Sequence, residues 1–206
     1  MKLPLHYQLS NYDCGPTSML NAIAFLFERE DVPPEIIRNI MLYSLDCYST
    51  DGLPGRRGTS CSAMMFLSSW LNDFGRLGLF PVSTEYLSGK QVYIGQQSRI
   101  NDALHRGGAV VVRLFYNEWH YVLFTGEQDG SIHLFDPYYR TEPFEQSDVI
   151  WTDQHPFDYN CIVPAERFNR TEQDLYSLAD LELREAVILY NNKTKLTADQ
   201  TIEYFI

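Results

Sequence analysis

The first third of the chain has apolar positions that recur every three or four residues, which is the spacing of an amphipathic helix. This pattern predicts a helix over 14–29, a second over 34–44 and a third over about 59–74. Between the second and third, residues 49–59 read "STDGLPGRRGT", and their Gly and Pro content predicts a loop.

The pattern changes at residue 109. Three short runs of β-branched and aromatic residues follow, at 109–115, 120–126 and 131–137, each bounded by turn residues. Their two faces are both largely apolar, so we expect a sheet that is covered on both sides. Upstream, the sequence predicts a short strand at 92–94 and a helix from Ser98 to the Gly107-Gly108 pair.

Helices first and antiparallel strands second indicate the α+β class. Beyond about residue 165 the pattern is weaker, and 171–190 is typical of one or two acidic amphipathic helices. We therefore expect one principal domain over 1–165, with a helical half packed on an antiparallel sheet, and a C-terminal helical extension of unknown role over 166–206.

Composition and charge narrow the classes of partner. A net charge of −11 disfavours nucleic acid and anionic membrane surfaces, because phosphates are bound by clustered Lys and Arg. No run of about 18 apolar residues predicts a membrane span, and the N-terminus does not resemble a signal peptide. We expect a cytoplasmic protein whose oligomeric state is open. Its four cysteines show no CxxC pairing or metal-ligand spacing, which favours free thiols.

One of these cysteines stands at a chemically distinctive place. Cys14 lies at the start of the first predicted helix, after Asp13 as a candidate N-cap and before Gly15-Pro16. The reactive form of a cysteine is the thiolate, and the N–H groups and dipole of a helix N-terminus favour an anion there. Cys14 is therefore a candidate nucleophile, with an ordinary buried thiol as the alternative.

A base for this nucleophile can be sought among the five histidines. The turn "GEQDG" at 126–130 suggests a hairpin centred on Gln128, in which one histidine faces a carboxylate across the two strands. That register pairs Phe124 with Ile132, Val122 with Leu134, and His120 with Asp136. A carboxylate at this position would fix the tautomer of the imidazole. A turn-forming Asp-Pro is the alternative for Asp136.

Gln8 lies six residues before Cys14. Its side-chain amide is a candidate donor to a developing oxyanion, beside the backbone N–H of Cys14. A solvated loop amide is the alternative.

These residues together resemble the double-glycine, bacteriocin-processing cysteine peptidases of the papain-like superfamily. The resemblance rests on Gln8, "YDCGPTS" with Cys14, "GTS" at 58–60, "EWHYVLFTG" with His120, and "FDPYY" with Asp136, in the order of that family and over about residues 6–140. It implies a papain-like fold, with a helical half that carries the cysteine and an antiparallel sheet that carries the histidine and aspartate.

The resemblance also implies the roles. Cys14 would be the nucleophile, His120 the general base and acid, Asp136 the residue that orients His120, and Gln8 part of the oxyanion hole. In the family these peptidases cut leader peptides after Gly-Gly. We expect a stand-alone cysteine peptidase that acts on a peptide or protein through a thioester and needs no cofactor or metal. An acyl or peptidyl transferase with the same residues, and a non-catalytic peptide-binding module, are the alternatives.

Overall fold

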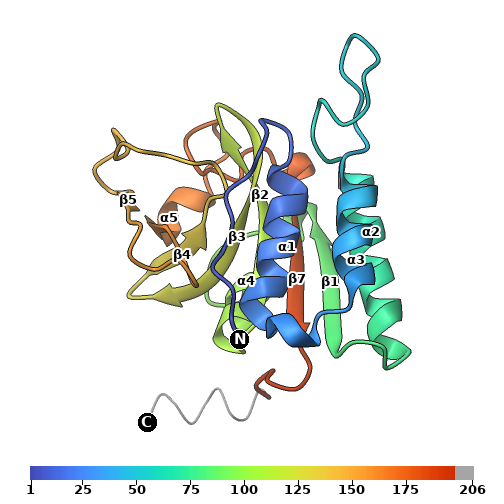
Figure 1. Ribbon diagram of the computed structural model, residues 1–206. Coiled ribbons are helices and arrows are strands. Elements are labelled where there is room, and N and C mark those ends of the chain that lie inside the picture. Colours follow the sequence, from blue (N-terminus) through green and yellow to red (C-terminus); the bar gives the residue numbers. More distant parts are fainter. Residues whose placement is uncertain (198–206) are drawn as a thin grey trace.

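The computed structural model of this chain describes residues 1–197, so the end of the predicted extension, 198–206, lies outside the described residues. Within residues 1–197 there are five α-helices and a seven-stranded sheet in which every strand pair is antiparallel (Figure 1). This mixed composition agrees with the predicted α+β class. None of the helices in this part of the chain is long and apolar enough to cross a membrane.

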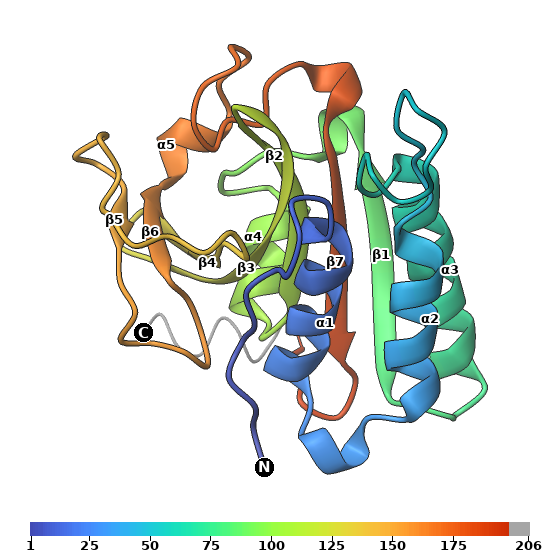
Figure 2. The same cartoon turned by 45° about the horizontal axis from the view of Figure 1, so that its top comes forward.

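Three helices lie together on one face of the sheet (Figure 2). These are α1 (Cys14–Leu26), α2 (Pro34–Ser44) and α3 (Cys61–Arg76), which confirms the three helices predicted for this region. The first packs on the central strands and the third on the edge strand, while α2 contacts α1 and α3. The hydroxyl of Ser60 caps α3 by accepting a hydrogen bond from the backbone N–H of Ala63 at 3.1 Å.

The opposite face is covered by α4 (Arg99–His105), whose N-cap is Ser98, as predicted, and by segments from the C-terminal third of the chain. The short helix α5 (Ala165–Phe168) belongs to that third. Three 3-10 turns complete the helical elements, at Arg29–Asp31, Gly89–Gln91 and Leu181–Leu183.

The strand order across the sheet is β1-β7-β2-β3-β4-β6-β5. The bounds are β1 Val82–Ser88, β2 Ala109–Tyr116, β3 Glu118–Gln128, β4 Ser131–Phe135, β5 Ile150–Trp151, β6 Cys161–Pro164 and β7 Glu185–Asn191. The three strands predicted after residue 109 are confirmed as β2, β3 and β4.

Side chains on both faces of the central strands are buried, as the apolar patterns predict. In β2, Val110 and Val112 join one core cluster with α4, and Ala109 and Val111 join the other with α1. All four are completely buried. The sheet is therefore the middle layer, with a separate hydrophobic core on each side.

The prediction of helices over 171–190 is wrong, because Glu185–Asn191 forms β7 (Figure 1). This strand pairs with β1 on one side and β2 on the other, and all its residues are buried. Its run "AVILY" is the uninterrupted apolar pattern of a strand buried on both faces, which periodicity alone does not separate from a helix. The sheet thus takes strands from both sides of residue 165, and the described part of 166–206 is not a helical extension.

The strand predicted at 92–94 is also wrong. Val92 and Ile94 are buried in the core, so their apolar character reflects burial. The backbone N–H and carbonyl of Ile94 are bonded by the side chain of Asn169, at 2.9 and 2.7 Å, in place of a neighbouring strand. The strand in this region is β1, which ends before Gly89 at a φ of 60°.

Candidate active site

Cys14 is the first residue of α1 and is 8% exposed. Asp13 occupies the N-cap position but does not cap the helix with its side chain. Its carboxylate instead accepts from the backbone N–H groups of Leu9 and Ser10, at 3.0 and 2.7 Å, and from the Ser10 hydroxyl. The first N–H groups of a helix have no partner within it, so this end of α1 is left to stabilise negative charge at Cys14.

The loop before α3 packs directly on this helix end. A Cβ on Gly15 would lie 2.3 Å from Oγ1 of Thr59, so only glycine leaves room for the loop. The Thr59 hydroxyl is buried there without a hydrogen-bond partner. Residues 58–60, the "GTS" of the sequence, therefore pack against the start of α1, and Gly15 is the residue that permits this close approach.

The β3–β4 hairpin places His120 and Asp136, but not through the register expected from the sequence. The turn has two residues, Asp129 and Gly130, with φ values of 51° and 74°, and Gln128 pairs with Ser131. Both positive values are typical of the mirror-image turns that match the strand twist. The predicted centre at Gln128 is therefore wrong.

A β-bulge between Phe124 and Gly126 restores the alternation. Beyond it, Phe124 pairs with Leu134 and Leu123 with Phe135, which is two residues from the predicted register. A shift of two keeps each side chain on its face, whereas the turn without the bulge would have placed His120 and Asp136 on opposite faces. The two residues therefore meet on one face as diagonal neighbours instead of directly opposite each other.

His120 and Asp136 form a buried pair. Nε2 of His120 lies 2.7 Å from Oδ1 of Asp136, and the two residues are 6% and 4% exposed. Burial alone would lower the pKa of His120. The charge and hydrogen bond of Asp136 and the contact with Cys14 raise it by more than burial lowers it, so the pKa is about 10. Burial raises the pKa of Asp136, and the charge and hydrogen bond of His120 lower it below its usual range. The geometry thus favours an imidazolium and a carboxylate at neutral pH.

The Cys14 side chain is the other hydrogen-bonding neighbour of the imidazole, and it also raises the pKa of His120. Since Nε2 is bonded to Asp136, Nδ1 is the nitrogen that is left for the thiol. An imidazolium beside a cysteine stabilises the thiolate form. The structure therefore brings Cys14, His120 and Asp136 together in that order, from α1, β3 and the end of β4.

Asp136 is held by further residues that the sequence did not single out. The side-chain amide of Asn160 accepts from the backbone N–H of Asp136 and donates to its carbonyl, both at 2.8 Å. The backbone N–H of Tyr138 donates to Oδ1, and the hydroxyl of Tyr176 donates to Oδ2 at 2.6 Å. No sequence motif marks Asn160 or Tyr176, because both become neighbours of Asp136 only through the sheet topology.

Gln8 lies beside this group, but its amide is turned toward its own loop. The backbone N–H of Gln8 donates to the carbonyl of Pro137 at 2.8 Å, next to Asp136. Its Nε2 donates to the carbonyl of Ser10 at 2.7 Å, and its Oε1 is buried without a partner. The structure thus places Gln8 near the site, with its side chain engaged by Ser10.

The other cysteines lie in different surroundings. Burial and the charge of Asp136 raise the pKa of Cys161, and burial and nearby carboxylates raise the pKa of Cys47 and of Cys61. Within residues 1–197 no group of three or more His, Cys, Asp or Glu side chains is arranged to hold a metal ion.

A pocket of about 360 Å³ lies next to the residues that carry the site. Its lining includes Tyr7, which precedes Gln8, Phe135, which precedes Asp136, and Asn160. Aromatic side chains from the following segment complete it, among them Tyr139 and Trp151. Its walls are mixed, because Arg140, Asp153 and His155 also line it.

Comparison of the sequence with protein-family models, and with curated proteins, finds no match.

Proposed function

We propose that the protein is a papain-like cysteine peptidase that hydrolyses an amide bond of a peptide or protein. The observation that carries this proposal is the contact of Cys14 with the imidazole of His120. Cys14 lies at the N-terminus of α1, which no side chain caps, and Nε2 of His120 is bonded to the buried Asp136. A nucleophile, a base and a residue that orients the base are the groups that acyl transfer through a thioester requires.

The first half of the reaction follows from the charges. The thiolate of Cys14 attacks the carbonyl carbon of the substrate, and its electron pair forms the C–S bond. The carbonyl oxygen takes the negative charge and is stabilised by the N–H groups at the start of α1. Gln8 would join these donors if its amide left the carbonyl of Ser10. The His120 imidazolium then gives its proton to the leaving amine as the C–N bond breaks, and a thioester remains.

The second half restores the enzyme. In the thioester Cys14 carries no charge, and the neutral imidazole of His120 accepts a proton from the attacking water. The oxygen of that water forms a bond to the carbonyl carbon, the C–S bond breaks, and the acid and the Cys14 thiolate are released. Asp136 stays bonded to Nε2 of His120 throughout and keeps the ring in one orientation.

The resemblance over about residues 6–140 to the double-glycine peptidases supports the same roles for Cys14, His120, Asp136 and Gln8. A leader peptide with Gly-Gly before the cut is therefore the substrate to test first. The negative charge of the chain is consistent with a peptide partner rather than a nucleic acid.

Hydrolysis of a peptide mixture that includes Gly-Gly leader sequences, followed by mass spectrometry, tests the proposal. We expect cleavage by the wild type, none by Cys14→Ala, and wild-type cleavage by Cys47→Ala, which changes a thiol outside the site. Products formed with an added amine would instead indicate a transferase. Cleavage by Cys14→Ala would contradict the proposal, and stable binding of uncut peptide by the wild type would favour a binding module.

A further inference from the structure

Tyr176 is a completely buried tyrosine that reaches the site from the C-terminal third of the chain. Its hydroxyl donates to Oδ2 of Asp136 at 2.6 Å, while His120 and the N–H of Tyr138 use Oδ1. Each carboxylate oxygen therefore has its own donors. Among residues 1–197, Tyr176 is the donor to Oδ2.

The backbone conformation at Tyr176 is fixed by its surroundings. Tyr176 has a φ of 60°, a left-handed conformation that bulky residues rarely adopt and that persists where the surroundings enforce it. Two backbone hydrogen bonds tie the segment to β2: the N–H of Tyr176 donates to the carbonyl of Phe115 at 2.8 Å, and the N–H of Phe115 to that of Ser177 at 2.9 Å.

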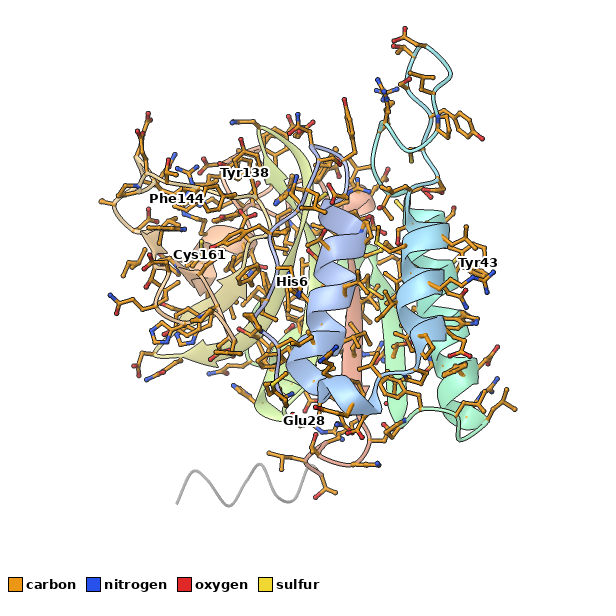
Figure 3. All side chains as sticks on the ribbon, in the orientation of Figure 1. His6, Glu28, Tyr43, Tyr138, Phe144 and Cys161 are labelled. Atoms are coloured by element: carbon orange, nitrogen blue, oxygen red, sulfur yellow. The ribbon has the colours of Figure 1, made fainter. Side chains whose placement is uncertain are left out.

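Aromatic packing fixes the ring as well. Tyr176 contacts the rings of Tyr116 and Phe144, with centroids 6.0 and 5.5 Å away, and Tyr116 in turn contacts His120. Figure 3 shows Phe144, Tyr138 and Cys161 on the same side of the molecule, away from α2. The hydroxyl of Tyr176 also lies 3.7 Å from the sulfur of Cys161.

The carboxylate of an aspartate turns easily about its last side-chain bond, because that torsion has no sharp minima. Asn160 fixes the backbone of Asp136 but leaves this torsion free. A donor on Oδ2 therefore limits rotation that the donors on Oδ1 alone would permit.

We propose that Tyr176 is a positioning residue of this site, which holds the Asp136 carboxylate ionised and oriented toward Nε2 of His120. The inference rests on the proposed function for its catalytic meaning. It assigns a role to a segment that the resemblance to a peptidase family does not reach.

The neighbouring ionisable groups are compatible with this role. Besides His120 and Tyr176, those around the pair are Cys14 from α1, Tyr116 from β2, Tyr138 and Arg140 from the loop after β4, and Cys161 from β6. Arg140, the cation of this set, is bonded to the hydroxyl of Tyr116. Burial and the charge of Asp136 raise the pKa of Tyr176 well above its usual value, so its hydroxyl keeps its proton and remains a donor.

Tyr176→Phe removes the hydroxyl and keeps the ring. The matched control is Tyr116→Phe, which removes a hydroxyl from the same aromatic group but one that is bonded to Arg140. We expect alkylation of Cys14 by iodoacetamide at pH 7 to be slower in Tyr176→Phe, by up to roughly ten-fold if the whole value of one hydrogen bond to a charged group reached Cys14, and unchanged in Tyr116→Phe. In an Asp136→Asn background, Tyr176→Phe should add no further loss.

A second readout does not depend on catalysis. The pKa of Asp136 is lowered by folding, so its contribution to stability is present above its unfolded pKa and is lost as the pH falls through the folded value. Removal of the Tyr176 hydroxyl takes away one cause of that lowering. The stability deficit of Tyr176→Phe in urea unfolding should therefore shrink as the pH is lowered from 7 into the acid range, and that of Tyr116→Phe should stay constant.

Two results would overturn the inference: equal alkylation rates in the two variants, or a deficit of Tyr176→Phe that does not change with pH. If the variant does not fold, 3-fluorotyrosine-labelled wild type serves, and a ¹⁹F signal of Tyr176 that fails to titrate in acid would refute the contact with an ionised Asp136. If wild-type Cys14 proves unreactive, the proposed function fails, while the pH-dependent stability still decides the role of Tyr176.

Discussion

Replacement of Asp136 by asparagine removes the charge that keeps His120 protonated and preserves the shape of the side chain. An asparagine carbonyl still accepts from Nε2 of His120, and its amide N–H can donate to the oxygen of Tyr176. The fold should therefore be retained, which circular dichroism can verify. What changes is the electrostatic balance at the imidazole, since its counter-charge is lost while its burial remains.

The size of the effect follows from the pKa of His120. Burial lowers this pKa, and Asp136, through its charge and its hydrogen bond, is the largest cause that raises it from 6.5 to about 10. Without the carboxylate we expect a much lower pKa, so a larger share of the imidazole is neutral at pH 7 and above. A free cysteine has a pKa of about 8.5 and is about 3% thiolate at pH 7, so an unassisted thiol reacts roughly 30-fold more slowly than a full thiolate.

Alkylation of Cys14 by iodoacetamide, followed by mass spectrometry from pH 5 to 11, measures this directly and needs no substrate. The wild type should be alkylated faster than Asp136→Asn across neutral pH, because the imidazolium beside Cys14 is lost in the variant. The two curves should meet above about pH 10, where the wild-type imidazolium also loses its proton.

Equal alkylation rates at pH 7 in the wild type and in folded Asp136→Asn would refute the reasoning, because the proton on His120 would then not depend on the carboxylate. Asn160→Ala is not a substitute for this experiment, since it removes two backbone contacts of Asp136 and alters position as well as charge.

Three further outcomes are expected. The folded pKa of His120 exceeds its unfolded value, so its stabilising contribution is complete below about pH 6.5 and is lost as the pH rises toward about 10. Urea unfolding over that range should show a decline in the free energy of unfolding that His120→Gln abolishes. Gly15→Ala should push Thr59 away and reduce the alkylation of Cys14. Gly126→Ala is the control, because a Cβ there meets nothing within 4 Å. Equal alkylation rates in the two variants would contradict the packing shown by the structure. A chain cut after residue 165 lacks β7 and should not unfold cooperatively in a thermal melt, and a cooperative melt would show that β7 is dispensable.

The residues proposed for the site could be named from the sequence because each lies in a short, recognisable sequence pattern. The position of Cys14 follows from the helical pattern behind it and from Gly15-Pro16, and the structure places it at the first residue of α1. His120 and Asp136 meet despite a wrong register. The shift between the predicted and observed pairing is two residues, and side-chain faces repeat with that period.

Two features set the register of the hairpin. The Asp129-Gly130 turn is a local Asp-Gly signal that the prediction of a turn centred on Gln128 did not use. The bulge between Phe124 and Gly126 is not visible in a hydrophobic pattern. The prediction of a helix over the residues of β7 fails because a continuous apolar run fits both a strand and a helix. Tyr176 could not be found, because its meeting with Asp136 requires the whole sheet to form.

The most direct test of the central claim compares the cysteines of one folded sample. Limiting iodoacetamide at pH 7, with quantification of each modified cysteine by mass spectrometry, ranks their reactivities. If Cys14 is a nucleophile activated by His120, it is modified well before Cys47, Cys61 and Cys161, whose pKa values are raised, and His120→Gln removes that lead. If Cys14 is modified no faster than the exposed Cys61, it is an ordinary thiol and the proposed active site is wrong.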